Sequence, residues 1–559
     1  MLLFYKMLKE EVKKFFQGEV LDDEPTLDKF SEDASIFKIK PELVVFPRNV
    51  EDVKNLVKFV STKKKRNKKI SLSARSAGTD MTGGSLTESI VIGFQKYFNH
   101  TKEIHYLLGD EGGYAVVEPG VYYRDFEKET LKKDLIYPVY PASRELCAMG
   151  GIVANNSAGE KSLAYGETKD YVMELKVVLS DGNEYTIRPL DEFELKKKIN
   201  QRNFEGQIYK KIWAIVKKNQ KLIWDSRPKV SKNSAGYFLW EVYDGKYFDL
   251  AKLIVGSQGT LGIITEAKLR LVKVKSHSRM AVIFLRDISQ VGKLVNIILK
   301  FQPESLESYD DKTLWLAFKF LPDLVKSLRQ KNQSLLKLFL AFLPDLWMVL
   351  TFGFPKMVLL AEFAGESDLE VRKAAEALAQ ELKAKRYRVH LTRSRVEEEE
   401  YWTIRRESFN LLRQKIKGRH TAPFIDDVIV NPEQMPEFLP RLNQLVSKYK
   451  ELTYTIAGHA GSGNFHIIPL ADFKNPALKD VIRKLSEEVY DLVKEFGGSI
   501  TAEHNDGLIR TPYLNKMFPP QMLKLFEEVK KIFDPQNIFN PGKKVNGNLN
   551  YALDRIKKE

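Results

Sequence analysis

The sequence predicts an α+β protein of two or three domains, and three observations lead to this fold class. At 559 residues the chain is too long for one hydrophobic core, because single cores stop growing at roughly 250–300 residues. Up to about residue 275, short apolar strands alternate with amphipathic helices, which indicates layered α/β structure. Beyond that point, apolar strands are separated by long helices rich in strong helix formers. We expect an N-terminal segment (1–40), two domains (41–275 and 276–500) and a C-terminal segment (501–559).

The first domain opens with a strand, a helix and a second strand. LVVF (43–46) is a short apolar run, residues 50–63 place apolar side chains at helical spacing, and KISLSAR (69–75) returns to a strand. A helical insertion is predicted near 190–225. Asp181-Gly182-Asn183 is predicted to form a hairpin turn, because these residue types tolerate positive φ. Further strands are expected in four places: 89–94, 114–121, 174–187 and 253–272.

The second domain contains one segment of unusual composition. Strands are expected at 281–285 and 357–365, and a helix at 369–385. Between them, the basic apolar arm at 312–356 interleaves large apolar residues with Lys and Arg, and its prolines prevent a simple membrane span. It could lie on an anionic bilayer or be a helical excursion packed on its own domain or on another subunit. No stretch approaches 18 uncharged apolar residues, so no transmembrane helix is predicted.

Composition limits the classes of partner and the compartment. The net charge of +15 suggests anionic partners, namely a nucleotide cofactor, carboxylate substrates or an acidic membrane surface. Because Lys and Arg are spread over the whole chain, we do not expect nucleic-acid binding. Cys147 is the only cysteine, which excludes intramolecular disulfides and an iron–sulfur cluster held by several cysteines of this chain. The start shows no secretory signal, and we expect a cytoplasmic protein.

Four titratable residues near the C-terminus form the strongest candidate for chemistry. His459 and His466 lie seven residues apart in AGHAGSGNFH, and Glu503 and His504 are adjacent in TAEHND. Two imidazoles and a carboxylate suit a divalent metal with one position left open, and the fourth group could act as a base beside it. Any one of these histidines could instead be a hydrogen-bonded loop residue. For the group, the surrounding glycines argue against a packed core.

Two glycine-rich segments suggest a large phosphate-bearing ligand. SARSAGTDMTGG (73–84) follows a predicted strand, and its backbone N–H groups could form a concave anion site. The segment at 140–166 repeats this chemistry with several glycines, Asn and Ser. Either loop alone could be an ordinary surface turn. Neither has the spacing of a Rossmann fingerprint or a P-loop, so the glycines do not identify the ligand.

Motifs along the chain resemble a known family. RSAGTDMTGG, then PAS…GGIVANNSAG…YG, then GSQGTLGIITEA, resemble the PCMH-type FAD-binding domain of the vanillyl-alcohol-oxidase superfamily. WTIRRE, IDDVIV, GHAGSGNFH, the Glu-His pair and IFNPGK resemble its FAD-linked C-terminal domain. The combination, from about residue 41 to 546, is similar to the D-lactate, glycolate and D-2-hydroxyglutarate dehydrogenase branch. The resemblance implies a two-subdomain FAD-binding domain, an α+β substrate domain, and a C-terminal segment that returns to the flavin.

The resemblance also implies residue roles. His459, His466 and Glu503 would bind a divalent metal, zinc or manganese, His504 would be the base, and Arg405 would anchor the substrate carboxylate. From the residues alone, Arg405 could equally form an ion pair with Glu398–Glu400 or Glu407 on one helix. No attachment residue is evident, so FAD is expected to be non-covalent. The expected FAD-binding residues are Arg75, Ser76, Ala77, Gly78, Thr79, Asp80, Pro141, Gly150, Gly151, Asn156, Ser157, Gly159, Gly166, Gly262, Ile264 and Asn540.

The reaction implied is oxidation of a D-2-hydroxy acid to the 2-oxo acid by hydride transfer to FAD. Electrons would then pass to a quinone, an Fe–S subunit or an electron-transfer flavoprotein, and the protein could be peripheral on the inner membrane face. A metal-independent flavin alcohol oxidase and a non-catalytic flavoprotein subunit are the alternatives. Three positions depart from the family pattern. Ser462 replaces the usual Asp of GDGN, and Asn505 replaces the glycine after the Glu-His pair. Phe409 occupies one of the positions that contact a second substrate carboxylate in 2-hydroxyglutarate enzymes.

Overall fold

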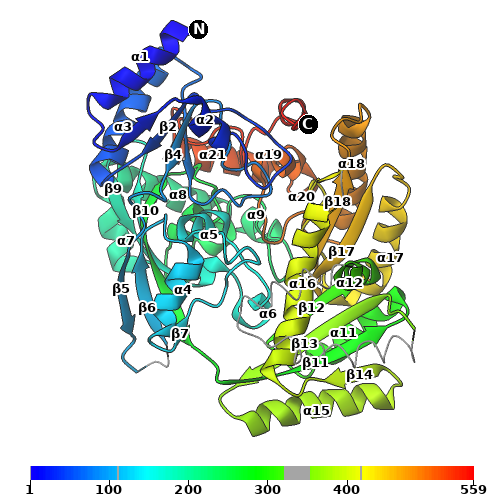
Figure 1. Ribbon diagram of the computed structural model, residues 1–559. Coiled ribbons are helices and arrows are strands. Elements are labelled where there is room, and N and C mark those ends of the chain that lie inside the picture. The colour runs from blue at the N-terminus through cyan, green and yellow to red at the C-terminus, as the bar shows by residue number, and fades with distance from the viewer. Residues whose placement is uncertain (1, 110–111, 320–352, 416–417, 559) are drawn as a thin grey trace.

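Two halves make up the molecule in Figure 1, a computed structural model that describes residues 2–109, 112–319, 353–415 and 418–558. The first half, blue to green, holds two sheets, and the second half, green to orange, holds a third. Most of the arm at 312–356 lies outside the described residues, so its two interpretations stay predictions.

The first sheet has four strands in the order β1-β2-β4-β3, and β2, β4 and β3 are parallel. Helix α3 begins after Asn49, whose side chain accepts from the Asp52 N–H, and it buries an apolar stripe at helical spacing. The N-terminal segment adds an edge strand, β1, to this sheet. The strands are β1 (Glu19–Leu21), β2 (Leu43–Phe46), β3 (Leu72–Arg75) and β4 (Ile90–Gly93), and the helices are α1 (Leu2–Lys13), α2 (Glu24–Phe30) and α3 (Val50–Lys64).

The second sheet is antiparallel, with the order β5-β6-β10-β8-β9 and β7 paired to β10. The strand predicted at 253–272 is wrong in its first half: a short helix and a turn come first, because Gly256, Gln258 and Gly259 all have positive φ. The strands are β5 (Thr101–Tyr106), β6 (Gly113–Val117), β7 (Leu135–Ile136), β8 (Val172–Val178), β9 (Glu184–Ile187) and β10 (Ile263–Lys273). The helices are α4 (Tyr123–Leu131), α5 (Met149–Asn155), α6 (Ser162–Tyr165), α7 (Glu192–Ile199), α8 (Phe204–Lys218), α9 (Gln220–Asp225) and α10 (Ala251–Ile254).

The third sheet buries both of its faces. Along its strand β11, Ala281, Ile283 and Leu285 pack on one side with α11, α15, α17 and α18, while Met280 and Val282 pack on the other with α12 and α16. The strands are β11 (His277–Leu285), β12 (Ser305–Asp310), β13 (Met357–Gly365), β14 (Arg388–Leu391), β15 (His420–Thr421), β16 (Val428–Ile429), β17 (Thr453–His459) and β18 (Asn464–Ala471). The helices are α11 (Val291–Leu299), α12 (Asp311–Lys319), α15 (Asp368–Ala384), α16 (Arg395–Lys415), α17 (Met435–Val446) and α18 (Leu478–Glu495).

The chain returns to the first half after the third sheet. Its last helices are α19 (Gly507–Arg510), α20 (Leu514–Met517), α21 (Pro520–Phe533) and α22 (Leu549–Leu553). The Leu72 N–H of β3 donates to the Ile538 carbonyl at 2.7 Å, and the Asn540 N–H donates back to the Leu72 carbonyl at 2.8 Å. Ile538 and Phe539 are fully buried in the core of the first sheet, so the C-terminal segment is part of that layer.

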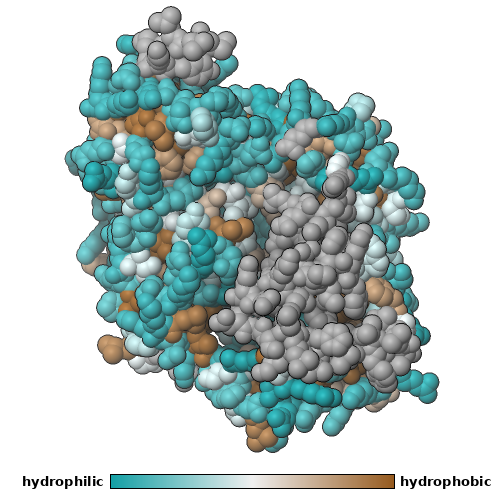
Figure 2. Space-filling view, viewed as in Figure 1, coloured by the Kyte–Doolittle hydropathy of each residue, from teal (hydrophilic) through white to brown (hydrophobic). Residues whose placement is uncertain are grey.

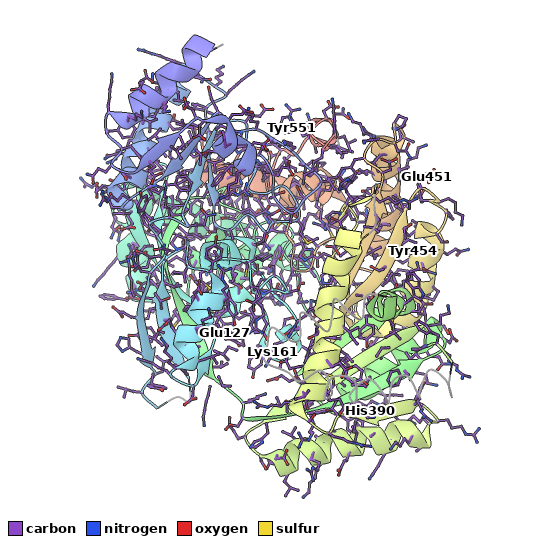
Figure 3. All side chains as sticks on the ribbon, in the orientation of Figure 1. Glu127, Lys161, His390, Glu451, Tyr454 and Tyr551 are labelled. Atoms are coloured by element: carbon purple, nitrogen blue, oxygen red, sulfur yellow. The ribbon has the colours of Figure 1, made fainter. Side chains whose placement is uncertain are left out.

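Charged contacts also join the two halves. Lys161, the residue before α6, is labelled between the two halves in Figure 3 and places its Nζ 3.3 Å from Glu304 Oε2 beside β12. The described surface seen in Figure 2 is mostly hydrophilic, with small apolar patches. Among the described helices, none is both long enough and apolar enough to cross a membrane.

Candidate functional site

A cavity of about 950 Å³ opens between the two halves. This volume is at the upper end of the range for ligand pockets, about 300–1,000 Å³. One wall comes from the loop after β3, from α5 and from the start of β10. The opposite wall comes from α16, β17, β18 and the loop that carries Glu503 and His504. The glycine-rich segments and the histidine cluster therefore face the same space.

Twelve of the expected FAD-binding residues line this cavity. At Gly151 an added Cβ would meet only Ser76, 3.6 Å away, so the missing side chain leaves open room on the cavity side. Gly78 has φ +74°, which lets the first loop turn tightly. A large flat ligand such as FAD fits a wall built in this way. The twelve are Arg75, Ser76, Ala77, Gly78, Thr79, Asp80, Pro141, Gly150, Gly151, Ser157, Gly262 and Ile264.

The other four are not among the residues that line the cavity: Asn156, Gly159, Gly166 and Asn540. The fully buried Asn156 amide donates to Glu167 at 3.0 Å, and Gly166 ends α6 with φ +76°. Gly159 lets its own backbone lie close to that of Tyr140, because an added Cβ would be only 2.2 Å from the Tyr140 carbonyl oxygen. The Asn540 amide donates to the carbonyls of Gly84 and Gln258, both at 2.7 Å. The contacts of Asn156, Gly159 and Asn540 therefore hold neighbouring loops in place.

The N-terminal segment reaches the cavity too. The Arg75 guanidinium contacts this segment, because it donates to the carbonyls of Phe30 at 3.1 Å and Glu32 at 2.6 Å. Asp33 lines the cavity, and burial together with the nearby Asp80 carboxylate raises its pKa to about 7. No motif in residues 1–40 indicated that this segment approaches the ligand space.

Of the four residues singled out in the sequence, His466, Glu503 and His504 line the opposite wall, and His459 is buried beside them. His459 at the end of β17 points its Nε2 at Glu503 Oε1, 3.1 Å away, and His466 of β18 points its Nε2 at the same oxygen, 3.3 Å away. The facing atoms of all three residues lie within 4.8 Å of one another. Ligands about 2.1 Å from a tetrahedral metal are about 3.4 Å apart, so the set fits a divalent cation.

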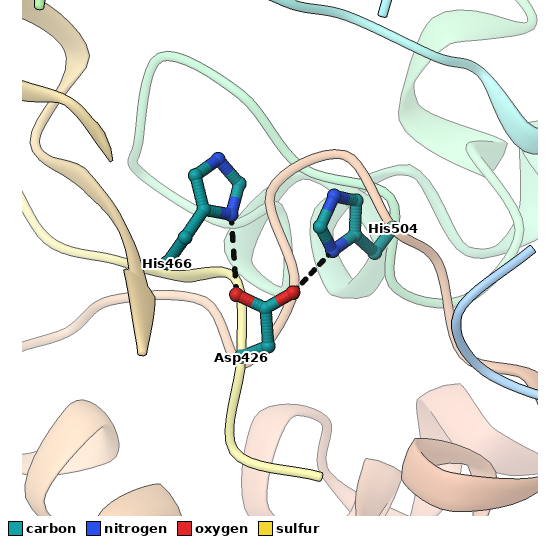
Figure 4. A group of neighbouring side chains, drawn as sticks. All are labelled: Asp426, His466 and His504. Carbon is teal, nitrogen blue, oxygen red and sulfur yellow. Dashed lines mark hydrogen bonds and ion pairs between the residues drawn. The ribbon is translucent and has the colours of Figure 1, made fainter. Parts of the chain in front are cut away.

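Asp426 bridges two of the imidazoles (Figure 4). Its Oδ1 lies 3.2 Å from His466 Nδ1 and its Oδ2 lies 2.7 Å from His504 Nδ1. The two rings are nearly parallel, with centroids 5.0 Å apart. Because the carboxylate engages both Nδ1 atoms, the Nε2 atoms of His466 and His504 are left for other partners.

The buried charges shift one another's pKa values. Burial alone would lower the pKa of His466, but Asp426 and Glu503 raise it to about 10. Burial would also lower the pKa of His504, but the nearby carboxylates of Asp426 and Asp427 raise it. Burial would raise the pKa of Glu503, yet Lys232 and His459 hold it well below its usual value. Without a metal, the raised pKa values of His466 and His504 therefore favour protonated imidazoles beside the ionised Glu503 carboxylate.

Two arginines of α16 line the same wall. Arg405 Nε donates to Glu307 Oε2 at 3.2 Å, and the other oxygen of this carboxylate lies 2.6 Å from His459 Nδ1. Glu307 thus connects the candidate carboxylate anchor to a candidate metal ligand. Arg406 pairs with the buried Glu160, and its Nε lies 3.0 Å from Glu160 Oε2.

Several residues of this site were missed in the sequence. Asp426 and Asp427 stand side by side in the quoted IDDV motif, but no role was assigned to them. Asp427 Oδ2 accepts from the backbone N–H groups of Glu503 at 2.8 Å and His504 at 2.7 Å, which fixes that loop. Glu307 and Lys232 carry no local signal, because they reach the site only through the tertiary fold.

Comparisons with known proteins agree with the geometry. Residues 41–188 match the family model described as FAD binding domain, and residues 274–544 match the one described as FAD linked oxidases, C-terminal domain. D-2-hydroxyglutarate dehydrogenase of Pseudomonas putida is 27% identical over 540 residues, covering 94% of this chain but 50% of that protein. The chain spans about half the length of the first curated relatives it matches.

Other relatives are matched over nearly their whole length. The glycolate oxidase subunit GlcD of Bacillus subtilis is 27% identical, over 91% of this chain and 89% of that protein. D-lactate dehydrogenase of Anaerostipes hadrus is 25% identical, over 97% of this chain and 98% of that protein. The 4-ethylphenol oxidase structure from Gulosibacter chungangensis superposes with a TM-score of 0.67 at 17% identity, covering 97% of both chains. A p-cresol methylhydroxylase structure gives the same TM-score at 16% identity, covering 98% of this chain and 97% of that one, which supports the predicted PCMH-type fold.

Proposed function

The chain belongs to the family of FAD-linked oxidases, and we propose that it oxidises a D-2-hydroxy acid to the 2-oxo acid. The observation that carries this proposal is the shared cavity, which is lined on one wall by the glycine-rich loops and on the other by His466, Glu503 and His504. FAD would be held non-covalently along the first wall. His459, His466 and Glu503 would hold a divalent metal at the second.

Each bound group would supply one kind of chemistry. FAD would accept the hydride that leaves C2 of the substrate. A zinc or manganese ion would act as a Lewis acid and lower the pKa of the substrate hydroxyl.

The chain's own residues would bind the acid and take its proton. Arg405 offers a planar fork for the substrate carboxylate, and the buried Glu307 limits the directions in which this fork can point. In its neutral form, His504 would take the hydroxyl proton at Nε2, since its Nδ1 faces Asp426. The hydroxyl proton and the hydride together account for the two electrons and two hydrogens lost.

The substrate class follows from relatives named for D-2-hydroxyglutarate, glycolate and D-lactate, all 2-hydroxy acids. Reduced flavin would then pass electrons to a quinone, an Fe–S subunit or an electron-transfer flavoprotein. A cytoplasmic protein with the arm at 312–356 resting on the inner membrane face would suit a quinone.

The test is anaerobic mixing of the purified FAD-loaded, metal-loaded protein with D-lactate, glycolate, D-2-hydroxyglutarate and bulkier D-2-hydroxy acids. The proposal expects bleaching of the flavin absorbance by at least one of them, with the matching 2-oxo acid as product. Failure of every 2-hydroxy acid would favour a non-catalytic flavoprotein. Bleaching by an alcohol without a carboxylate, unaffected by metal removal, would favour a metal-independent flavin alcohol oxidase.

A further inference from the structure

A buried lysine contacts the metal-ligand carboxylate and has no part in the proposed reaction. The Lys232 side chain is 1% exposed, and its Nζ lies 2.9 Å from Glu503 Oε2. The lysine comes from the first half of the molecule, between α9 and α10, whereas Glu503 lies in the C-terminal segment. Placing a cation here requires desolvating it, and the ion pair offsets that cost only in good geometry.

The segment around Lys232 is fastened to the loops that carry the ligands. Ser231 Oγ donates to the Ser462 carbonyl, between His459 and His466, at 3.2 Å. Ser234 donates from its Oγ to the Ala502 carbonyl at 2.9 Å and from its N–H to the Thr501 carbonyl at 3.1 Å. These bonds on both sides of Lys232 fix its backbone against the ligand loops.

The two oxygens of Glu503 have different partners. Oε2 faces Lys232, while Oε1 faces the Nε2 atoms of both His459 and His466. A carboxylate held in this way offers one oxygen to a cation and is kept from binding through both.

We propose that Lys232 is a positioning residue that restricts Glu503 to one metal-facing oxygen and lowers the affinity of the site for its cation. This inference rests on the metal site of the proposed function. The positive charge of Lys232 offsets the negative charge of the Glu503 carboxylate. The same positive charge would also repel a divalent ion bound at this carboxylate. A cation that receives less negative charge from its ligands withdraws more electron density from a bound hydroxyl.

The test compares wild-type protein with Lys232→Met, which keeps the length of the side chain and removes its charge. We expect Lys232→Met to bind Zn²⁺ or Mn²⁺ at least about tenfold more tightly in direct titrations. We also expect the metal-free variant to melt earlier, with a larger rise in Tm on adding metal, because the ion then replaces the lost partner of Glu503. Lys232→Arg, which keeps the charge, should stay within about threefold of the wild-type affinity.

Two controls separate this role from general loss of a buried lysine. Lys530 is also buried and pairs with Asp534 at 2.6 Å, so Lys530→Met should lower the Tm without changing metal affinity. In a Glu503→Gln background, adding Lys232→Met should raise the affinity by less than it does in the wild-type background, because only the direct repulsion of the cation is then removed.

The outcomes distinguish this inference from the proposed function. Unchanged or weaker metal binding by folded Lys232→Met would overturn the role of Lys232 and leave the metal site standing. If Lys232→Met does not fold, Lys232→Gln, which keeps a donor without the charge, must bind metal more tightly than wild type or the inference fails. A wild-type protein that binds neither cation would overturn both.

Discussion

Asp426 is expected to make metal binding depend on pH, because it raises the pKa of the ligand His466. At pH 8 an imidazole with a pKa of about 10 is neutral in roughly 1 of 100 molecules. A metal must displace this proton from Nε2, which costs about 3 kcal/mol at that pH. Wild-type protein should therefore release about one proton per metal bound, and its affinity should rise about tenfold per pH unit over the range of about pH 7 to 8.5.

The variant Asp426→Asn removes the largest contribution that raises this pKa. The pKa of His466 should then fall toward its usual value, and proton release at pH 8 should drop below about half a proton. Metal affinity itself is a poor readout for this variant. Losing the hydrogen-bond partner of His466 Nδ1 weakens metal binding about 10–100-fold, which offsets the gain from the lower pKa of His466. The diagnostic quantity is the proton count, measured by calorimetric titration in buffers of different ionisation enthalpy.

A matched control exists elsewhere in the chain. His390 Nε2 lies 2.5 Å from Glu397, so Glu397→Gln also removes a carboxylate from an imidazole and should leave the proton count unchanged. The reasoning is refuted if Asp426→Asn, folded and metal-binding, releases as many protons as wild type with the same pH slope.

Three further predictions concern the same cavity. His504→Ala should keep FAD but reduce the flavin at least about 100-fold more slowly in stopped-flow mixing, and near-normal rates would reject it as the base. Gly151→Leu should fill the open room on the FAD wall and lose the cofactor, while the circular dichroism spectrum stays that of the wild-type fold. Gly151→Ala should bind FAD more weakly but detectably. Full flavin content in both variants would place the cofactor elsewhere. Arg405→Met should raise KM for the hydroxy acid about 10–100-fold and Arg405→Lys by less, so an unchanged KM would remove Arg405 as the carboxylate anchor.

Local patterns predicted much of the fold. The strand at 43–46 and the helix at 50–63 are β2 and α3, because both follow from periodicity and capping within a few residues. The strand predicted at 253–272 begins ten residues late, at Ile263, because apolar residues there belong to a short helix and a positive-φ turn. Apolar composition alone does not separate these states.

The site was predictable only where its residues cluster in the sequence. His459, His466 and the adjacent Glu503 and His504 carry a metal-and-base pattern that can be read locally. Lys232 lies 271 residues before Glu503, and Glu307 lies 152 residues before His459. No spacing rule links positions so far apart, since only the packing of the two halves brings them together. The contribution of Asp33 was missed for the same reason.

The central claim is that the histidine cluster and the FAD wall form one active site. Its most direct test is the anaerobic rate of flavin reduction by a responsive 2-hydroxy acid, measured on one preparation before metal removal, after chelation and after metal is restored. The account predicts that FAD stays bound throughout, and that reduction falls at least about 100-fold on chelation and recovers when the metal returns. Reduction that is equally fast in the fully metal-depleted protein would contradict it.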